Sequence, residues 1–371
     1  MSRPGPSVHQ LYKRLETVGR GAYGSVHKGI EIATGNVVAL KIINLDTEDD
    51  DVGDIQREVA LLTQLRDAPN VTKYYGCYLD GPRVWIVMEY AQGGSVRTLM
   101  KACPDGIVEE KYTVIVVREV LAALAYLHRS GIIHRDIKAA NILITAAGKV
   151  MICDFGVSAL LTTATSKRNT FIGTPYWMAP EVAQAVPNYD TKADIWSLGI
   201  LIYEMAKGSP PHSNLDAARV LQLLPRTRAP RLVEGEGSKD MREFVALCLK
   251  ESSVDVSVPS STGGLYIDTL QRLPAEELSK TKWIKMAGKI PNAVLKEMLT
   301  RYEAWSEGGG TRTSLADPLG WEDEENQCVC LYPLSRKRLN PHQTRSSFIV
   351  IVGCVAIRYS QEYVRIKGAN R

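Results

Sequence analysis

The chain carries its most specific chemistry in one short stretch, His134-Arg135-Asp136-Ile137-Lys138-Ala139-Ala140-Asn141. The Asp136 carboxylate can orient an attacking hydroxyl group and accept its proton, and the Lys138 ammonium can neutralise charge on a phosphoryl group in transfer. Asn141 offers a neutral oxygen, which is a suitable ligand for Mg²⁺. His134 is expected to be a packed structural histidine. These residue types at this spacing predict a site for phosphoryl transfer.

A second motif, Asp154-Phe155-Gly156, follows the apolar runs 142–144 and 150–152. Two short apolar runs joined by a glycine-containing turn predict a hairpin, and this hairpin brings Asn141 and Asp154 to the same open end. Asp154 is expected to hold Mg²⁺ bridging the β- and γ-phosphates, and Gly156 allows the backbone to turn. Because the tripeptide alone is common by chance, the prediction of a metal ligand at Asp154 depends on its position directly after the hairpin.

A glycine-rich loop, Gly19-Arg20-Gly21-Ala22-Tyr23-Gly24-Ser25-Val26, lies between two strand-like runs. Its glycines let backbone N–H groups approach phosphate oxygens, although an ordinary tight hairpin is the alternative. A dinucleotide-binding fold needs a helix directly after the glycines, whereas a strand-like run follows here. On the next strand, Lys41 can reach the α- and β-phosphates, and Glu58 is the carboxylate expected to hold its ammonium. Considered separately, Lys41 and Glu58 would each be interpreted as a charged side chain exposed to solvent.

The pattern along the chain divides it into a β-rich part and a helical part. Strand-like runs occupy 15–18, 25–31, 37–44, 72–79 and 83–90, with one helix at 53–65. Helical periodicity follows at 112–128, 193–207 and 239–249. We therefore expect an α+β fold with a small mostly-β lobe and a larger mostly-α lobe. The expected parts are an N-terminal arm at 1–10, the two lobes at 11–92 and 93–285, an amphipathic helix at 286–307 with its periodic residues at 292–307, and a linker or disordered tail at 308–371.

The composition is ordinary for a globular protein, with 45% hydrophobic and 23% charged residues. A net charge of +4 without a long basic stripe argues against a nucleic-acid partner. The N-terminus lacks the apolar run of a signal peptide. The most apolar stretch, 348–357, is shorter than the roughly 20 residues that span a bilayer. We expect no membrane span and a cytoplasmic protein whose seven cysteines are reduced.

In this order, the motifs resemble those of the eukaryotic protein kinase family over about residues 11–284. The resemblance implies a two-lobed fold that binds ATP with Mg²⁺, or Mn²⁺, in the cleft. It implies that Met88-Glu89-Tyr90-Ala91 forms the hinge, that Met88 is the gatekeeper and that Glu89 and Ala91 offer backbone groups to adenine. It also implies that Ala39 and Leu143 sandwich the adenine ring. The residues expected around ATP are Val18, Gly19, Arg20, Gly21, Ala22, Tyr23, Gly24, Val26, Ala39, Lys41, Met88, Glu89, Ala91 and Leu143.

Lys138 and the stretch 173–181, which contains Thr174, look like those of Ser/Thr kinases rather than Tyr kinases. By this resemblance Thr174 bonds Asp136 and Lys138. The loop 167–175 and Tyr74-Tyr75-Gly76 are similar to germinal-centre kinases, the sterile-20-like branch, and the C-terminal helix with 313–321 looks like fungal polarity kinases. This implies protein substrates, a role in cell polarity or morphogenesis, an armadillo-like scaffold partner, and an upstream or self-activating kinase.

Arg135 is expected to be a positive charge that awaits an anion. Phosphorylated Thr170 would supply about −1.5 to −2 charge and order the activation segment through charge-assisted bonds. By the same resemblance, Phe155 and Gly156 are expected to support this segment. The alternative is that Thr170 is an ordinary polar loop residue.

The chain departs from the family before Arg272, the expected ion-pair partner of Glu181. An insertion of roughly 253–270 separates Arg272 from the preceding helix. Valine codons begin with GT and glutamine can be encoded by CAG, so 254–271 is hypothesised to be translated intron; a genuine surface loop is the alternative. The tail 346–371 is treated as possible read-through. A loosened ion pair would leave a catalytically impaired kinase-fold scaffold, but Lys41, Glu58, Asp136, Asn141 and Asp154 are all present and favour an active enzyme.

Overall fold

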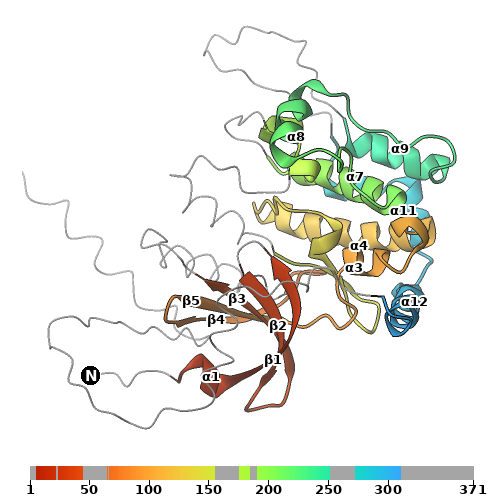
Figure 1. Ribbon diagram of the computed structural model, residues 1–371. Helices are drawn as coiled ribbons and strands as arrows, with labels where there is room; N and C mark the ends of the chain where they lie inside the picture. The colour runs from red at the N-terminus through yellow and green to blue at the C-terminus, as the bar shows by residue number, and fades with distance from the viewer. Residues whose placement is uncertain are drawn as a thin grey trace, which may run out of the picture. The chain divides into compact units, whose positions relative to one another are not determined.

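A computed structural model describes residues 6–21, 24–44, 65, 67–154, 175–183, 190–250 and 272–310. They form two compact units (Figure 1). The sheet unit comes from the chain before Asp46 together with Tyr75–Met88, and the helical unit comes mainly from Glu89–Ala316. The expected α+β fold with a mostly-β part and a mostly-α part is confirmed.

The sheet unit is a five-stranded sheet with the strand order β1-β2-β3-β5-β4. One face of β3 carries the buried residues Val38, Leu40 and Ile42, which pack with Trp85 and Val87 of β5. This alternation is what a strand with one face on a core produces. The strands are β1 (Tyr12–Gly21), β2 (Gly24–Glu31), β3 (Val37–Asn44), β4 (Tyr74–Asp80) and β5 (Arg83–Glu89).

Helix α1 (Val8–Leu11) completes the core of the sheet unit. Val8 is 3% exposed and belongs to the cluster of β3 and β5 side chains. His9 holds the helix to the sheet edge, since its Nε2 lies 2.8 Å from the Asp80 carboxylate and its ring meets Trp85 edge-on at 5.0 Å. The expected N-terminal arm therefore ends in a packed helix.

The helical unit is built around α4 (Glu110–Arg129) and α7 (Lys192–Lys207), which lie side by side (Figure 1). Both are apolar over most of their length because they are covered on several sides. Helix α7 ends at Gly208, whose φ of 77° is the left-handed conformation that glycine adopts most easily. Helices α9 (Lys239–Cys248) and α11 (Lys282–Ala287) pack beside them.

The helical unit also contains further helices, several 3₁₀ turns and one hairpin. The helices are α3 (Val96–Met100), α6 (Pro180–Ala183), α8 (Ala217–Leu223), α10 (Ala275–Leu278) and α12 (Lys296–Glu307). The 3₁₀ turns are η1 (Pro104–Gly106), η2 (Ala139–Asn141), η3 (Pro175–Trp177), η4 (Leu224–Arg226) and η6 (Asn292–Leu295). Strands β6 (Ile142–Ile144) and β7 (Val150–Ile152) form the predicted hairpin.

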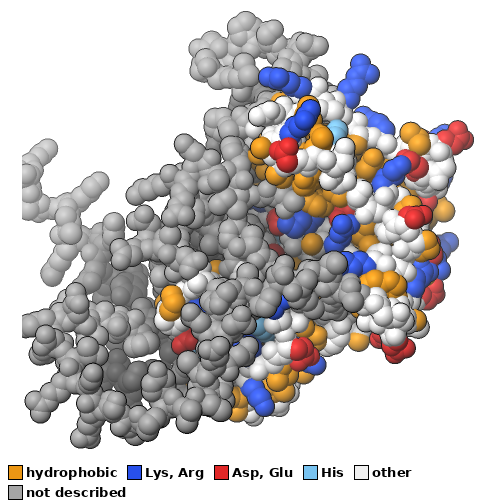
Figure 2. Space-filling model, viewed as in Figure 1, with side chains coloured by type: hydrophobic (Ala, Val, Ile, Leu, Met, Phe, Trp, Pro, Cys, Tyr) orange, Lys and Arg blue, Asp and Glu red, His pale blue; other side chains and the backbone are white. Residues whose placement is uncertain are grey.

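Most predicted elements are present, with ends shifted by at most three residues; the largest shift is in β1, which extends three residues beyond the predicted 15–18 at each end. The helix predicted at 292–307 begins as the 3₁₀ turn η6 and continues as α12. The helix predicted at 53–65 lies outside the described residues except for Leu65, and the insertion at 254–271 and the tail beyond 310 also lie outside them. Within the described ranges, no helix combines the length and apolarity needed to cross a bilayer. Figure 2 shows lysine and arginine side chains interspersed with aspartate and glutamate on the described part of the face in view.

Candidate active site

The loop that contains the predicted catalytic residues is fixed to helix α7 by Asp194. This carboxylate is fully buried and accepts the backbone N–H groups of His134 and Arg135, each at 2.8 Å. The ring nitrogen Nε2 of His128 lies 2.9 Å from the same carboxylate. Arg135 has a φ of 71°, an unfavourable conformation for a residue with a side chain, and the bond to its N–H helps to hold it there. The sequence reasoning missed Asp194.

His134 is a structural histidine in this loop, as expected, and is 1% exposed. The backbone N–H of Asp136 donates to its Nδ1 at 3.2 Å, so Nε2 carries the proton and faces the Cys153 carbonyl oxygen at 3.1 Å. Burial lowers the pKa of His134, which keeps the ring neutral. The neutral ring links the catalytic loop to the end of β7.

Asp136, Lys138 and Asn141 come together as the sequence predicts. The Lys138 ammonium lies 2.8 Å from Oδ2 of Asp136. The Asn141 side-chain N–H donates to the same oxygen at 2.7 Å and to the Asp136 carbonyl oxygen at 2.8 Å. Because both side-chain contacts fall on Oδ2, Oδ1 is the oxygen that a substrate hydroxyl can approach.

The β6–β7 hairpin brings the two predicted metal ligands to one end. Ile142 pairs with Ile152, and the Cys153 N–H donates to the Asn141 carbonyl oxygen at 3.0 Å, so Asp154 follows immediately beyond this pairing. Asn141 uses its side-chain nitrogen on Asp136, which leaves its amide oxygen for a cation. An amide oxygen and a carboxylate are hard ligands that fit Mg²⁺. Among the described residues no three His, Cys, Asp or Glu side chains gather into a metal site.

In the sheet unit, the register of β1 and β2 places Gly21 opposite Gly24, and the intervening Ala22 and Tyr23 lie outside the described residues. A Cβ atom at Gly24 would lie 2.0 Å from the Ile42 carbonyl oxygen, so only glycine fits this approach of two strands. The sequence predicted a glycine loop here, and the structure shows why one of its glycines is needed.

Lys41 lies on the face of the sheet opposite the core cluster. It pairs across the strands with Val26, and Ala39 is two residues earlier on the same face of β3. The core cluster contains Trp85 and Val87 but not Met88, so alternation along β5 places Met88 with this second face. Four predicted nucleotide contacts thus share one surface of the sheet. Val18, Gly19 and Arg20 lie on β1, where Gly19 pairs with Val26.

The predicted hinge residues of the helical unit, Glu89 and Ala91, lie in a tightly bonded segment. The Glu89 N–H donates to the Lys73 carbonyl oxygen at 2.8 Å, and the Lys149 ammonium lies 3.3 Å from the Glu89 carboxylate. The Ala91 carbonyl oxygen accepts the Gly94 N–H at 3.1 Å. Leu143, on β6, forms a backbone bridge with Ser95 just beyond this segment.

Glu204 of α7 is a second buried carboxylate that the sequence reasoning missed. It is 1% exposed and accepts the Ala139 N–H at 3.1 Å and the Trp177 indole N–H at 2.9 Å. Burial raises its pKa, and these two bonds act in the opposite direction. Its signal in the sequence is a charge inside the apolar run 198–205, at a helix position that faces the core.

The expected ion pair of Glu181 with Arg272 is present. Nη2 of Arg272 donates to Oε2 of Glu181 at 3.0 Å, and the side chains are 2% and 3% exposed. Arg272 also donates to the carbonyl oxygens of Lys250 at 2.9 Å and Lys192 at 3.2 Å, and its guanidinium lies 4.9 Å from the centre of the Trp196 ring. The guanidinium therefore holds the two ends of the predicted insertion together.

Several predicted residues lie outside the part of the chain that the structure describes. They are Ala22, Tyr23, Glu58, Phe155, Gly156, Thr170 and Thr174. Their roles stay predictions.

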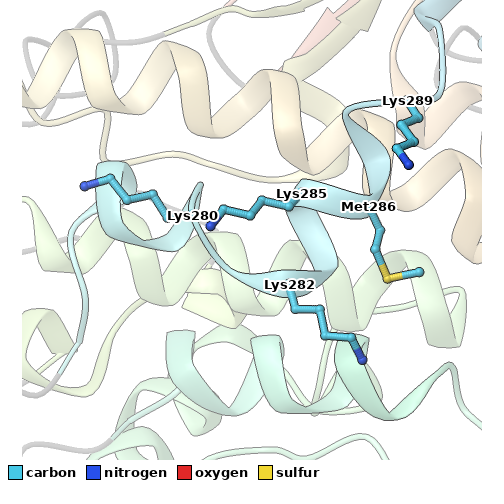
Figure 3. Close-up of a pocket in the computed structure, with 5 residues that line it drawn as sticks. All are labelled: Lys280, Lys282, Lys285, Met286 and Lys289. Carbon is cyan, nitrogen blue, oxygen red and sulfur yellow. The ribbon is translucent and has the colours of Figure 1, made fainter.

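A hollow of about 530 Å³ lies on the helical unit (Figure 3). Its lining consists of Met286 and the lysines Lys280, Lys282, Lys285 and Lys289. Lys280 and Lys282 are already paired, at 2.6 Å with Glu277 and at 2.8 Å with Asp240. No predicted site residue lines the hollow, so it is not the phosphoryl-transfer site.

Comparison with known proteins identifies the family. Residues 12–255 match the model described as "Protein kinase domain". The chain belongs to the protein kinase family. The serine/threonine-protein kinase KIC1 of Saccharomyces cerevisiae is 45% identical over 295 residues, which are 80% of this chain and 26% of that relative. The serine/threonine-protein kinase ppk11 of Schizosaccharomyces pombe is 41% identical over 299 residues, 81% of this chain and 88% of ppk11.

The serine/threonine-protein kinase sid1 of Schizosaccharomyces pombe is 42% identical over 284 residues, which are 76% of this chain and 56% of sid1. These relatives confirm the predicted resemblance to Ser/Thr kinases of the sterile-20-like branch. The chain spans about a quarter of KIC1 and about half of sid1. The family match ends at residue 255, beside the predicted start of the insertion.

Proposed function

We propose that the chain is a Ser/Thr protein kinase that transfers the γ-phosphate of ATP to hydroxyl groups of protein substrates. The observation that carries this proposal is the cluster of Asp136, Lys138 and Asn141 at the open end of the β6–β7 hairpin. Each of these side chains has a definite task in phosphoryl transfer.

Asp136 acts on the substrate hydroxyl. Lys138 and the Asn141 amide nitrogen hold its Oδ2, so the orientation of Oδ1 is fixed before the substrate binds. Oδ1 orients the hydroxyl and accepts its proton as the oxygen attacks. Lys138 lies close enough to stabilise the negative charge that builds up on the transferred group.

Asn141 and Asp154 are the residues that would hold a divalent cation. Lys41 would contact the phosphates of the nucleotide, and Glu58 would hold the Lys41 ammonium. When bound, the cation supplies positive charge to the β- and γ-phosphates. Mg²⁺ is proposed as the physiological metal, with Mn²⁺ as a substitute. Transfer rates measured with each metal in turn test this choice.

Transfer of radiolabelled phosphate from ATP to a generic basic protein tests the proposed activity. The control is Asp154→Ala, which removes one metal ligand. Transfer by the unmodified chain that disappears in Asp154→Ala supports a kinase. Nucleotide binding without transfer in any phosphorylation state would favour the alternative, a catalytically impaired kinase-fold scaffold.

Regulation by phosphorylation at Thr170 is part of the proposal. Arg135 stands directly before Asp136 and is fixed through its backbone to Asp194, so an anion that binds its side chain acts next to the catalytic residue. Thr170→Ala is expected to lower activity strongly. A fully unphosphorylated preparation with unchanged specific activity would contradict this regulation.

The cellular setting is proposed from the same family relationship. Similarity to fungal Ser/Thr kinases supports a signalling role in cell polarity or morphogenesis, in the cytoplasm, with an armadillo-like scaffold protein and an activating kinase as partners. Residues 254–271 are proposed to be translated intron and the tail 346–371 read-through. Sequencing the mature transcript tests both proposals. A major transcript without these segments supports them, and a major transcript that contains the segments contradicts them.

A further inference from the structure

Helix α12 is fastened to the beginning of α4 by three polar contacts of two residues, Glu297 and Arg301, which lie one turn apart. The Glu297 carboxylate accepts the Tyr112 hydroxyl at 2.6 Å and the Lys111 ammonium at 2.9 Å. The Arg301 guanidinium donates to the Glu109 carboxylate at 2.8 Å. The bond from Tyr112 and then that from Lys111 lower the pKa of Glu297. These contacts give α12 a defined position on the helical unit.

The inner face of α12 presses on the chain just beyond the hinge. Leu299 is 9% exposed. A Cβ atom at Gly93 would lie 2.6 Å from the Cδ2 of Leu299 and 2.5 Å from the Ile144 carbonyl oxygen. Real Cβ atoms do not approach other atoms so closely, so Gly93 passes between α12 and β6 at a point where only glycine fits.

The segment that Leu299 touches carries the predicted adenine contacts. The Gly94 N–H donates to the Ala91 carbonyl oxygen at 3.1 Å, and the Gly94 carbonyl oxygen accepts the Ile144 N–H at 2.9 Å. Ser95 then bridges to Leu143 on β6. The backbone from Ala91 to Ser95 is therefore bonded to the strand that bears Leu143, and Leu299 packs against the middle of this segment.

The turn before α12 supports the other end of the same hairpin. A Cβ atom at Gly148, where φ is 85°, would lie 2.5 Å from the Asn292 carbonyl oxygen. Arg118 of α4 donates to the Asn292 side chain and to the Ile290 carbonyl oxygen, the latter at 2.9 Å. The segment from 290 to 299 thus contacts the turn of the β6–β7 hairpin through Asn292 and the segment bonded to β6 through Leu299.

We propose that α12 is a positioning element of the nucleotide site, in which Leu299 holds Gly93 and Gly94 against β6 and so fixes Ala91 relative to Leu143. This inference rests on the proposed kinase function. Leu299 does not touch the reacting atoms. Its loss loosens the support for adenine and leaves the cluster around Asp136 unchanged.

The test uses the full chain with Leu299→Ala and, as a smaller truncation, Leu299→Val. Met298→Ala is the matched control, because Met298 is also buried on α12, at 1% exposed, but none of its atoms is among the three nearest to a Cβ at Gly93. We expect Leu299→Ala to raise the KM for ATP and the Kd for ADP about fivefold with kcat changed less than about twofold, the signature of lost nucleotide binding. The KM for protein substrate stays unchanged, and Leu299→Val gives a smaller shift in the same direction.

Two results would overturn the inference. One is an unchanged ADP affinity in the folded Leu299 variants, measured by calorimetry with Mg²⁺ present. The other is an equal loss of affinity in Met298→Ala, which would assign the effect to general loosening of the helix. If the unmodified chain itself binds no nucleotide, the proposed kinase function fails and this inference fails with it.

Discussion

Replacing Arg272 by methionine tests the contact that joins the two sides of the predicted insertion. Methionine keeps much of the length and apolar surface of the side chain but removes the guanidinium. Glu181 then remains as a buried carboxylate at 3% exposed, without the partner that lies 3.0 Å away. The carbonyl oxygens of Lys250 and Lys192 lose a donor in the same step.

The expected loss follows from this burial. Removing one partner of a buried ion pair costs about 3–5 kcal/mol because the other charge stays in the interior. Since native domains are stable by roughly 5–15 kcal/mol in total, the loss is a large fraction of the free energy of unfolding. Urea denaturation followed by tryptophan fluorescence measures it directly. The double variant Glu181→Gln with Arg272→Met is expected to recover part of the loss, because no charge is left unpaired.

Arg129→Met is the matched control. Arg129 pairs with Glu276 at 2.6 Å, but the side chains are 63% and 48% exposed, so its replacement should change the free energy of unfolding little. A loss for Arg272→Met no larger than that for Arg129→Met would refute the reasoning. So would a double variant that is as unstable as the two single variants combined, since the coupling of Glu181 with Arg272 would then be absent.

Three further predictions concern the catalytic loop and the insertion. Asp136→Asn should keep ADP affinity in calorimetry and lower turnover by about 100-fold or more in the radiolabel assay, because only the hydroxyl-orienting group changes; near-normal turnover would contradict the assignment. Burial lowers the pKa of His134 in the folded protein. Below the ordinary histidine pKa of about 6.5 the unfolded state therefore binds more protons than the folded state. The free energy of unfolding then falls as the pH is lowered, by at most about 1.4 kcal/mol per pH unit for one group. Denaturation of His134→Gln between pH 5.5 and 7.5 should therefore show a flatter pH dependence than the unmodified chain, and an equal slope would contradict it. Deleting residues 255–270 should change the free energy of unfolding by only about 1 kcal/mol, because Arg272 already holds the Lys250 carbonyl oxygen at 2.9 Å and loop closure depends weakly on length; a collapse of cooperative unfolding would show that the segment is part of the fold.

Local patterns predicted the sheet and the hairpin well. The strand β3 (Val37–Asn44) has the predicted bounds because its apolar run ends where turn residues begin. The hairpin of β6 and β7 was predicted from two apolar triplets, and its register places Asn141 and Asp154 at one end. In both cases the information lies within about ten residues of the element that it specifies.

The polar contacts of α12 show where such patterns fail. Glu297 and Arg301 are spaced as a solvated face of an amphipathic helix would be, and the periodicity predicted only that the helix exists. In the structure both residues bond to groups near the start of α4, more than 180 residues earlier in the chain. No local signal distinguishes a charge that faces water from one that meets a distant partner.

The missed carboxylates of α7 have the same explanation, and together they show what gives the catalytic loop its shape. Asp194 binds the first residues of the loop through His134 and Arg135, and Glu204 binds it again at Ala139. Ten residues of a helix place Asp194 and Glu204 about 15 Å apart along the axis, measured between their Cα atoms. The loop is therefore attached at two fixed points of one buried helix, and the rigidity of α7, together with the bonds from Asn141 to Asp136, sets the position of Asp136 between them.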